Sequence, residues 1–175
     1  MLSLKVKNYV LVGYDGERIF RGASVRSRAD ELFGREFIAE AVNLLVRGEK
    51  EKVAELYRVI ASDIEARRMP LQKYARRERI TEKTFTSDSR KRLAEAARGV
   101  SVGEYVSVYE RSDGTIGLAA DYKGDEDTKY LLDKLYKFAL RLREAFGDDF
   151  DILFPKPSAK SRSEAAGQKT LGLFD

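Results

Sequence analysis

Near its N-terminus the chain alternates short apolar runs with polar turns, a pattern typical of β-structure. Residues 4–23 are predicted to form a β-hairpin, because Tyr9–Val12 and Arg18–Phe20 flank an Asp-Gly pair that suits a tight primed turn. The apolar residues of this hairpin fall on both of its faces, so both faces need cover. We expect the rest of the chain to cover one face and a second polypeptide to cover the other.

The middle of the chain carries apolar residues at helical spacing. One amphipathic helix is predicted over residues 29–46, and Gly48 supplies its C-terminal stop. A second helix is predicted over residues 49–67, and it ends before Pro70, which cannot continue a helix. Because the turn between them is short, the two helices should pack as an antiparallel hairpin.

A basic segment and a shorter helix follow. Residues 76–83 are interpreted as a connector, because they carry four Lys or Arg residues and no clear apolar period. The short helix is predicted over residues 89–98. Ser87 or Asp88 is its expected N-cap, since both residue types can accept a hydrogen bond from the first turn.

The last folded part of the chain combines a second hairpin with a final helix. Residues 104–118 alternate polar and apolar side chains around an Asp-Gly turn, which predicts the hairpin. Asp127 or Thr128 is the expected N-cap of the helix, which is predicted to continue until Gly147. Together these elements predict an α+β fold.

Beyond Pro155 the chain becomes rich in small and polar residues, which cannot bury a core. We predict a disordered tail that acts as a tether. It ends in an apolar cluster that contains Gln168, Leu171, Leu173 and Phe174. An apolar cluster at the end of a tether suits capture by a partner's groove. The alternative, in which the tail packs back on its own domain, stays open.

The composition excludes several kinds of chemistry. The chain of 175 residues has no Cys and no His, which rules out disulfides, thiolate nucleophiles, Ser–His hydrolysis and the usual zinc sites. Carboxylate-bound magnesium, a lysine, or no chemistry at all remains. No apolar run approaches the roughly 20 residues that span a bilayer, and the N-terminus lacks a signal-peptide pattern, so we expect a cytoplasmic protein.

Positive charge is concentrated in one stretch. Residues 67–98 hold eleven Lys or Arg and four Asp or Glu, a local charge of +7, whereas the whole chain carries +4. Such a stretch indicates either a positive surface for nucleic acid or a solvated, salt-bridged face. Charge alone does not separate the two.

The segment Lys5-Val6-Lys7-Asn8-Tyr9 and the hairpin that follows it resemble the palm–thumb junction of family B DNA polymerases. The resemblance continues through the helix pair and the basic stretch to Gly147. It implies a palm-end hairpin over residues 1–24 that completes a palm sheet, a mainly helical thumb over residues 25–154, and a tether over residues 155–175. The implied DNA-binding residues are Lys5, Lys7, Asn8, Tyr9, Arg26, Arg76, Arg77, Arg79, Thr81, Lys83, Lys91 and Arg92.

The end of the tail resembles the sliding-clamp motif of replicative polymerases. Gln168, Leu171, Leu173 and Phe174 match its spacing and lean toward the bacterial type. The resemblance therefore implies the thumb part of a DNA-directed DNA polymerase, a nucleotidyltransferase, that grips primer–template DNA and recruits the clamp for processive synthesis in replication or repair. Its expected partners are DNA, the catalytic palm and fingers, and the clamp, with no membrane.

No cofactor is expected in this chain, because the resemblance puts the catalytic aspartates and their magnesium on another chain or a missing segment. The chain fits either the small subunit of a split polymerase or a piece of a longer one. The alternative function is a non-catalytic clamp-binding adaptor in DNA repair or replication.

Two acidic groups suggest a third possibility, a small magnesium nuclease. The segment 122–128 is similar to the metal-binding turn of family B polymerases, yet it opens a helix, so we interpret Asp125, Glu126 and Asp127 as capping acids. The acids of segment 148–151 are interpreted as part of a solvated loop. The nuclease hypothesis would require these two groups to hold magnesium.

Overall fold

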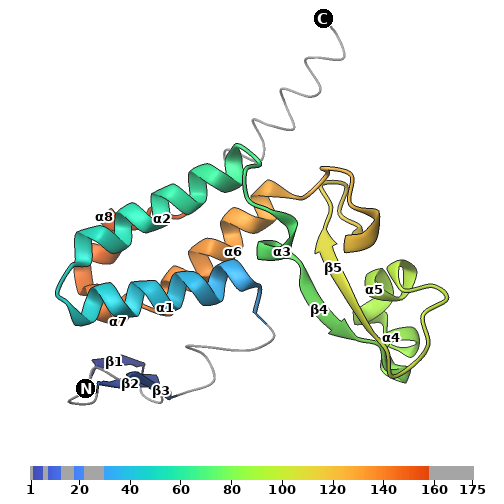
Figure 1. Cartoon of the computed structure of the whole chain (residues 1–175), viewed down its shortest axis with the longest axis horizontal. Coiled ribbons are helices and arrows are strands. Elements are labelled where there is room, and N and C mark those ends of the chain that lie inside the picture. Colours follow the sequence, from blue (N-terminus) through green and yellow to red (C-terminus); the bar gives the residue numbers. More distant parts are fainter. Residues whose placement is uncertain (1, 6–7, 13–17, 22–29, 158–175) are drawn as a thin grey trace, which may run out of the picture.

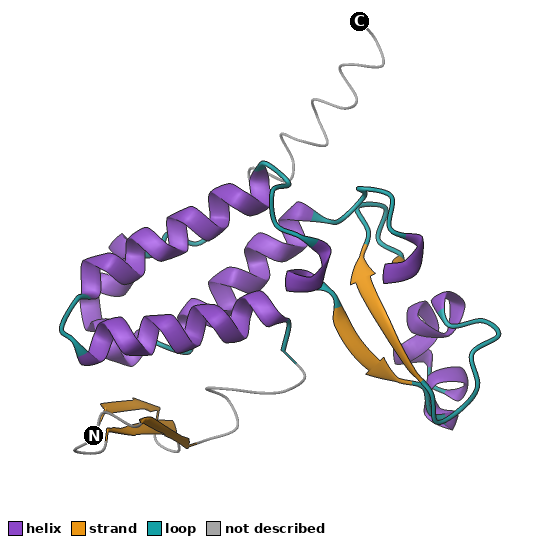
Figure 2. Cartoon of the chain, in the orientation of Figure 1, coloured by secondary structure: helices purple, strands orange, loops and turns teal. Residues whose placement is uncertain are grey.

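The computed structural model describes residues 2–5, 8–12, 18–21 and 30–157 (Figure 1). Helices dominate this part of the chain, and strands form two three-stranded antiparallel sheets (Figure 2). The predicted α+β fold class is confirmed. Within the described residues, no helix combines the length and the apolar character needed to cross a bilayer.

The N-terminal sheet has the strand order β1-β2-β3, with β1 at Leu2–Lys5, β2 at Asn8–Val12 and β3 at Arg18–Arg21. Strands β2 and β3 form the predicted hairpin, although its turn lies outside the described residues. Strand β1 was not predicted as a separate strand. It pairs with β2 and also contacts helix α7 (Arg143–Phe146). Its residues Leu2-Ser3-Leu4-Lys5 alternate apolar and polar side chains, a strand period that the prediction overlooked.

The predicted helix pair forms the helical bundle together with the C-terminal part of the chain. Helices α1 (Leu32–Val46) and α2 (Lys50–Glu65) join at a turn in which Gly48 has a φ of +75°, a conformation that glycine adopts without strain. Helix α6 (Thr128–Leu140) packs against both of them. Figure 1 shows the three helices lying side by side.

Helices α1 and α6 approach each other closely at Phe138 of α6. Its ring meets the ring of Phe33 edge to face at 5.6 Å and lies directly over Gly34. A Cβ atom on Gly34 would come within 2.1 Å of the Phe138 ring, so only glycine lets α1 and α6 approach this closely. The sequence therefore fixes this crossing with one small and one large residue.

The final helix is shorter than predicted. It ends at Leu140 and is followed by α7, by a 3₁₀ turn η3 (Gly147–Asp149) and by α8 (Phe150–Leu153). The apolar residues Leu142, Phe146, Phe150 and Phe154 continue at a spacing of four, which hides the break from a periodicity argument. The bends let their side chains close one end of the bundle, where all four are buried.

The acids of segment 148–151 consequently lie in helical turns and not in the predicted loop. They are exposed, and Asp151 forms an ion pair with Arg143 at 3.3 Å. Within the described residues there is no cluster of three or more acidic side chains that could hold a metal ion.

The second sheet belongs to a smaller part of the molecule, here called the sheet subdomain, that follows the short helix α3 (Leu71–Tyr74). Strand β4 (Arg76–Arg79) pairs with β5 (Tyr105–Glu110), and β5 pairs with β6 (Ile116–Leu118). Between β4 and β5 lie α4 (Glu82–Thr86), the 3₁₀ turn η1 (Asp88–Arg90) and α5 (Lys91–Ala96), and η2 (Ala119–Asp121) follows β6. This subdomain has its own core, made of Ile80, Leu93, Ala97, Val108 and Ile116.

The interpretation of residues 76–83 as a connector is therefore wrong. They form a strand and the start of a helix. Strand β4 contains four charged residues, so it gives no apolar period, and its conformation is set by pairing with β5. The expected N-cap is also wrong, because α5 begins after Arg90. The Ser87 hydroxyl bonds to the Ser89 hydroxyl at 2.8 Å, and Asp88 lies in the 3₁₀ turn η1.

Buried tyrosines make the stability sensitive to alkaline pH. Burial, assisted by nearby Tyr136, raises the pKa of Tyr57 from 10.0 to about 12, and burial also raises the pKa of Tyr74 and of Tyr130. A raised folded-state pKa contributes stability that is complete below the unfolded value and is lost as pH rises through the folded value.

We expect the urea midpoint to be constant from pH 8 to 9.5 and to fall between pH 10 and 12. The free energy of unfolding of the Tyr57→Phe variant should fall less steeply with pH, because its ring cannot ionise. By pH 12 the variant should have lost on the order of 2 kcal/mol less than the unsubstituted chain. Urea unfolding followed by circular dichroism at each pH measures both proteins. Equal pH dependence in the two proteins would contradict a role for Tyr57.

Candidate nucleic-acid interface

The outer face of the β4–β5 pair is open to solvent. Side chains alternate across a strand, and Val106 and Val108 lie with the core on the inner face. The opposite positions of the two strands are exposed. They are Arg77, Arg79, Tyr105 and Ser107, and the register pairs Arg77 with Ser107 and Arg79 with Tyr105.

Arg77 is held in place by an aromatic ring. Its guanidinium carbon lies 4.1 Å from the centroid of the Tyr105 ring, a cation–π stack. Tyr105 remains 53% exposed in this arrangement, so the stack is part of the surface. No acid of the described chain forms an ion pair with Arg77 or Arg79. The face therefore presents two available cations on a rigid strand pair.

Two further predicted cations lie in the same subdomain. Lys83 is exposed on α4, and Lys91 is exposed at the start of α5, and neither forms an ion pair with an acid in the described residues. Thr81 has a local role, because its N–H donates to the Thr84 hydroxyl at 3.0 Å at the start of α4. Thr81 thus fixes the helix that carries Lys83.

Arg76 and Arg92 are engaged with the protein itself. The carboxylate of Glu110, 10% exposed, bridges them: Arg76 donates to one oxygen at 3.1 Å, and Arg92 donates to the other. Arg76 also bonds to Glu78 at 3.2 Å, and Arg92 bonds to the Gly114 carbonyl at 2.8 Å. These two arginines tie β4 and α5 to β5 and are less available to a ligand than Arg77 and Arg79.

Removing the bridging carboxylate should destabilise the sheet subdomain. We expect Glu110→Ala to lower the free energy of unfolding by about 2 kcal/mol, because it leaves the mostly buried Arg76 with fewer acceptors. Urea unfolding measures the change. Glu82→Ala, an exposed acid on α4, is the control, with an expected change below about 0.5 kcal/mol. Equal effects of the two substitutions would exclude the bridge as a stabilising element.

The remaining predicted DNA-binding residues belong to the N-terminal part. Lys5 and Asn8 are register partners between β1 and β2, and Tyr9 pairs with Ser3 on one side and Arg21 on the other. The structure thus brings these three predicted positions together on adjacent strands. Lys7, Arg26 and the predicted clamp-binding residues Gln168, Leu171, Leu173 and Phe174 lie outside the described residues.

Arg67 of the bundle contacts segment 122–128, which leads from the sheet subdomain into α6. Arg67, at the end of α2, has a φ of +56° and donates to the carbonyls of Gly124 and Glu126 at 3.0 and 3.2 Å. Its guanidinium also lies 3.2 Å from the carboxylate of the buried Glu126, which accepts a hydrogen bond from Tyr122 at 2.6 Å.

Only one of the three predicted capping acids caps a helix. The Asp127 carboxylate accepts from the Tyr130 N–H at 3.1 Å, as expected for an N-cap. Glu126 pairs with Arg67 instead, and Asp125 accepts from the Tyr109 hydroxyl at 2.6 Å, a bond that holds the pKa of Asp125 below its ordinary value. The prediction is therefore wrong for Asp125 and Glu126, because their side chains bind residues that are distant in the sequence and do not cap the helix.

Sequence reasoning missed Tyr105, Glu110 and Arg67. Tyr105 carried a detectable signal, since it occupies a polar position of an alternating strand and so faces outward. Glu110 and Arg67 carried none, because their partners are distant in the sequence.

Of the comparisons with known proteins, the one with solved structures gives a match. No family model matches the chain, and no curated protein matches it. Among solved structures, the chain is similar to the family B DNA polymerase from the hyperthermophilic archaeon Pyrobaculum calidifontis, with a TM-score of 0.64 and 19% sequence identity. The likeness covers 82% of this chain and 21% of that chain. The chain thus spans about a fifth of the length of that polymerase and shares the fold of the matching part.

Proposed function

We propose that this chain is the thumb portion of a family B DNA polymerase, which grips the primer–template duplex behind the catalytic centre. The observation that carries the proposal is the open β4–β5 face, where Arg77 and Arg79 form no ion pair with an acid of the described residues, in a fold similar to part of such a polymerase. Arginine and lysine side chains bind phosphates regardless of base sequence, which suits a protein that must hold any duplex.

The basic residues of the sheet subdomain have two roles in this proposal, phosphate contact and positioning. Arg77, Arg79, Lys83 and Lys91 contact phosphates, and Tyr105 orients Arg77 by stacking. Arg76 and Arg92 act through Glu110 by holding the strands that carry the face. The strand positions Lys5, Asn8 and Tyr9 continue the duplex contact toward the palm, which contributes the catalytic aspartates and the magnesium.

Equilibrium binding to duplex DNA tests this proposal. Fluorescence anisotropy of a labelled primer–template, titrated with the chain between 50 and 200 mM salt, yields the salt slope. Four phosphate contacts predict a slope of about −3.6 and an affinity loss of about 100-fold over this range. Absence of binding at 50 mM salt, or a slope near zero, would contradict the proposal.

In this proposal the end of the tail binds the sliding clamp. Removing residues 168–175 is expected to lower clamp-dependent processivity by about 100-fold, because tethering to the clamp replaces repeated binding from solution. The affinity of the chain for DNA without clamp should not change. Lys169→Ala changes a position between the motif residues Gln168 and Leu171 that is not itself one of them, so it is the matched control and should retain processivity. Primer-extension length with clamp measures both, and unchanged lengths after the deletion would exclude the clamp role.

A further inference from the structure

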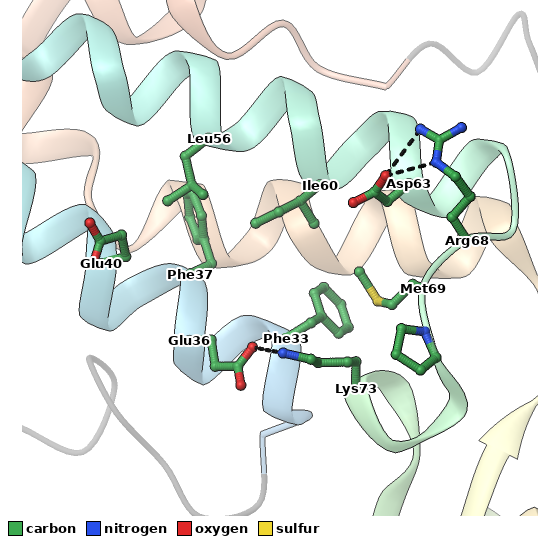
Figure 3. Close-up of a pocket in the computed structure, with 11 residues that line it drawn as sticks. Phe33, Glu36, Phe37, Glu40, Leu56, Ile60, Asp63, Arg68, Met69 and Lys73 are labelled. Carbon is green, nitrogen blue, oxygen red and sulfur yellow. Dashed lines mark hydrogen bonds and ion pairs between the residues drawn. The ribbon is translucent and has the colours of Figure 1, made fainter.

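A groove opens on the helical bundle. It has a volume of about 280 Å³ and lies between α1, the C-terminal half of α2 and the segment that leads into α3 (Figure 3). Its apolar lining consists of Phe33, Phe37, Leu56, Ile60, Met69 and Pro70. The groove is large enough for two or three apolar side chains of a peptide.

Both cations at the rim are paired with acids, and the third acid there, Glu40, accepts a hydrogen bond from Asn43 at 3.5 Å. Lys73 bonds to Glu36, and Arg68 bonds to Asp63 at 3.0 Å, as Figure 3 shows. With its cations neutralised, the groove offers no site for a phosphate or a carboxylate. An apolar segment with little net charge is the occupant that this chemistry favours.

We propose that the groove holds the apolar end of this chain's own tail, Leu171, Leu173 and Phe174. The described chain ends close to it: the Phe154 ring packs on Tyr57 at 5.1 Å, and Tyr57 packs on Phe37 of the groove wall at 6.2 Å. Three residues after Phe154 the description ends at Pro157. Two ring contacts therefore separate Phe154, three residues before Pro157, from the groove wall.

The length of the tail permits the docking. Residues 158–170 can span up to about 40 Å at roughly 3.3 Å per residue, whereas α2 is about 24 Å long. The motif can thus reach the groove around either end of α2. Its side-chain charges flank the apolar residues, with Lys169 before them and Asp175 after them.

Docking in the groove and docking on a clamp exclude each other, because both use the same side chains; this consequence rests on the proposed clamp role. A tethered motif has an effective concentration on the order of 1 mM, so a groove with a dissociation constant of about 100 µM holds the tail roughly 90% of the time. The apparent affinity for the clamp then falls by about 10-fold. The groove would keep the motif covered until a clamp competes for it.

A single tryptophan in the chain alone tests the docking. The sequence contains no Trp, so Phe174→Trp supplies a unique reporter at the motif. We expect its emission to be blue-shifted and its acrylamide quenching several-fold weaker than in a peptide of residues 168–175 with the same substitution. Adding Ile60→Lys or Met69→Lys, two groove variants whose folding circular dichroism checks, should return both values to those of the peptide.

The matched control is Val59→Lys. Val59 is next to Ile60 in the sequence, outside the groove lining and 59% exposed, so this charge should leave the signal unchanged. A Trp as open to quencher as the peptide, or an equal response to Val59→Lys, overturns the docking. A signal that depends on protein concentration does so too, because it would show docking between copies.

A measurement of clamp binding distinguishes this proposal from the proposed clamp role. With Phe174 retained, Ile60→Lys should raise the affinity for the clamp by about 10-fold, and Val59→Lys should not. If the buried Trp is observed but no clamp binds, the clamp role fails and the docking stands. If clamp binds the chain and Ile60→Lys equally well, the competition is overturned.

Discussion

Phe138→Ala is expected to lower the free energy of unfolding by about 3–5 kcal/mol, one of the two largest effects that the structure predicts. The ring is 1% exposed, meets Phe33 edge to face and lies under the Arg141 guanidinium at 4.8 Å. Its removal leaves a cavity between α1 and α6, because Gly34 has no side chain to fill it. Urea unfolding measures the loss.

Phe85→Ala serves as the control for this substitution. Phe85 has the same side chain but is 47% exposed on α4, so we expect a change of at most about 1 kcal/mol. Gly34→Ala tests the same contact from the other side and should destabilise by about 1–3 kcal/mol through overpacking. A loss below 1 kcal/mol for Phe138→Ala would mean that this crossing does not hold the bundle together.

The double substitution Arg77→Ala, Arg79→Ala is expected to weaken duplex binding by about 10- to 100-fold near 100 mM salt. Both cations lie on the open face without an acidic partner in the described residues, so their removal costs phosphate contacts and not internal ion pairs. The salt slope should fall by about 2, since each phosphate contact contributes about 0.9. The anisotropy titration measures both quantities.

Two other variants complete this test. Arg47→Ala, Arg58→Ala removes two exposed arginines from the bundle and should leave affinity and slope nearly unchanged. Tyr105→Phe should retain binding, and Tyr105→Ala should lose several-fold, because only the ring orients Arg77. An equal loss in both double variants would show that net charge, and not the β4–β5 face, governs the affinity.

Local patterns in the sequence predicted the helical bundle well. The period of apolar residues placed α1 and α2 within a few residues of their ends, and Asp127 was correctly expected at the start of α6. These features depend on neighbours within one or two turns, which a sequence displays directly.

Several of the misses share a physical cause, dependence on partners that are distant in the sequence. Strand β4 consists of charged residues and exists because β5 pairs with it. Arg76 looks like any other basic residue until Glu110, 34 positions away, accepts its hydrogen bond. The sequence identifies Arg77 and Arg79 as cations. It does not show that they face solvent while Arg76 lies on the opposite side of the strand, because that depends on the strand alternation of the fold.

Primer extension tests the central claim most directly. The palm-and-fingers portion of the polymerase should be assayed with and without this chain across a salt series, with the Arg77→Ala, Arg79→Ala variant beside it. We predict that the chain restores DNA affinity and product length, that the gain fades as salt rises, and that the variant loses most of it. If the chain adds nothing at any salt concentration, the thumb assignment is contradicted, and clamp binding without any gain in synthesis would identify an adaptor instead.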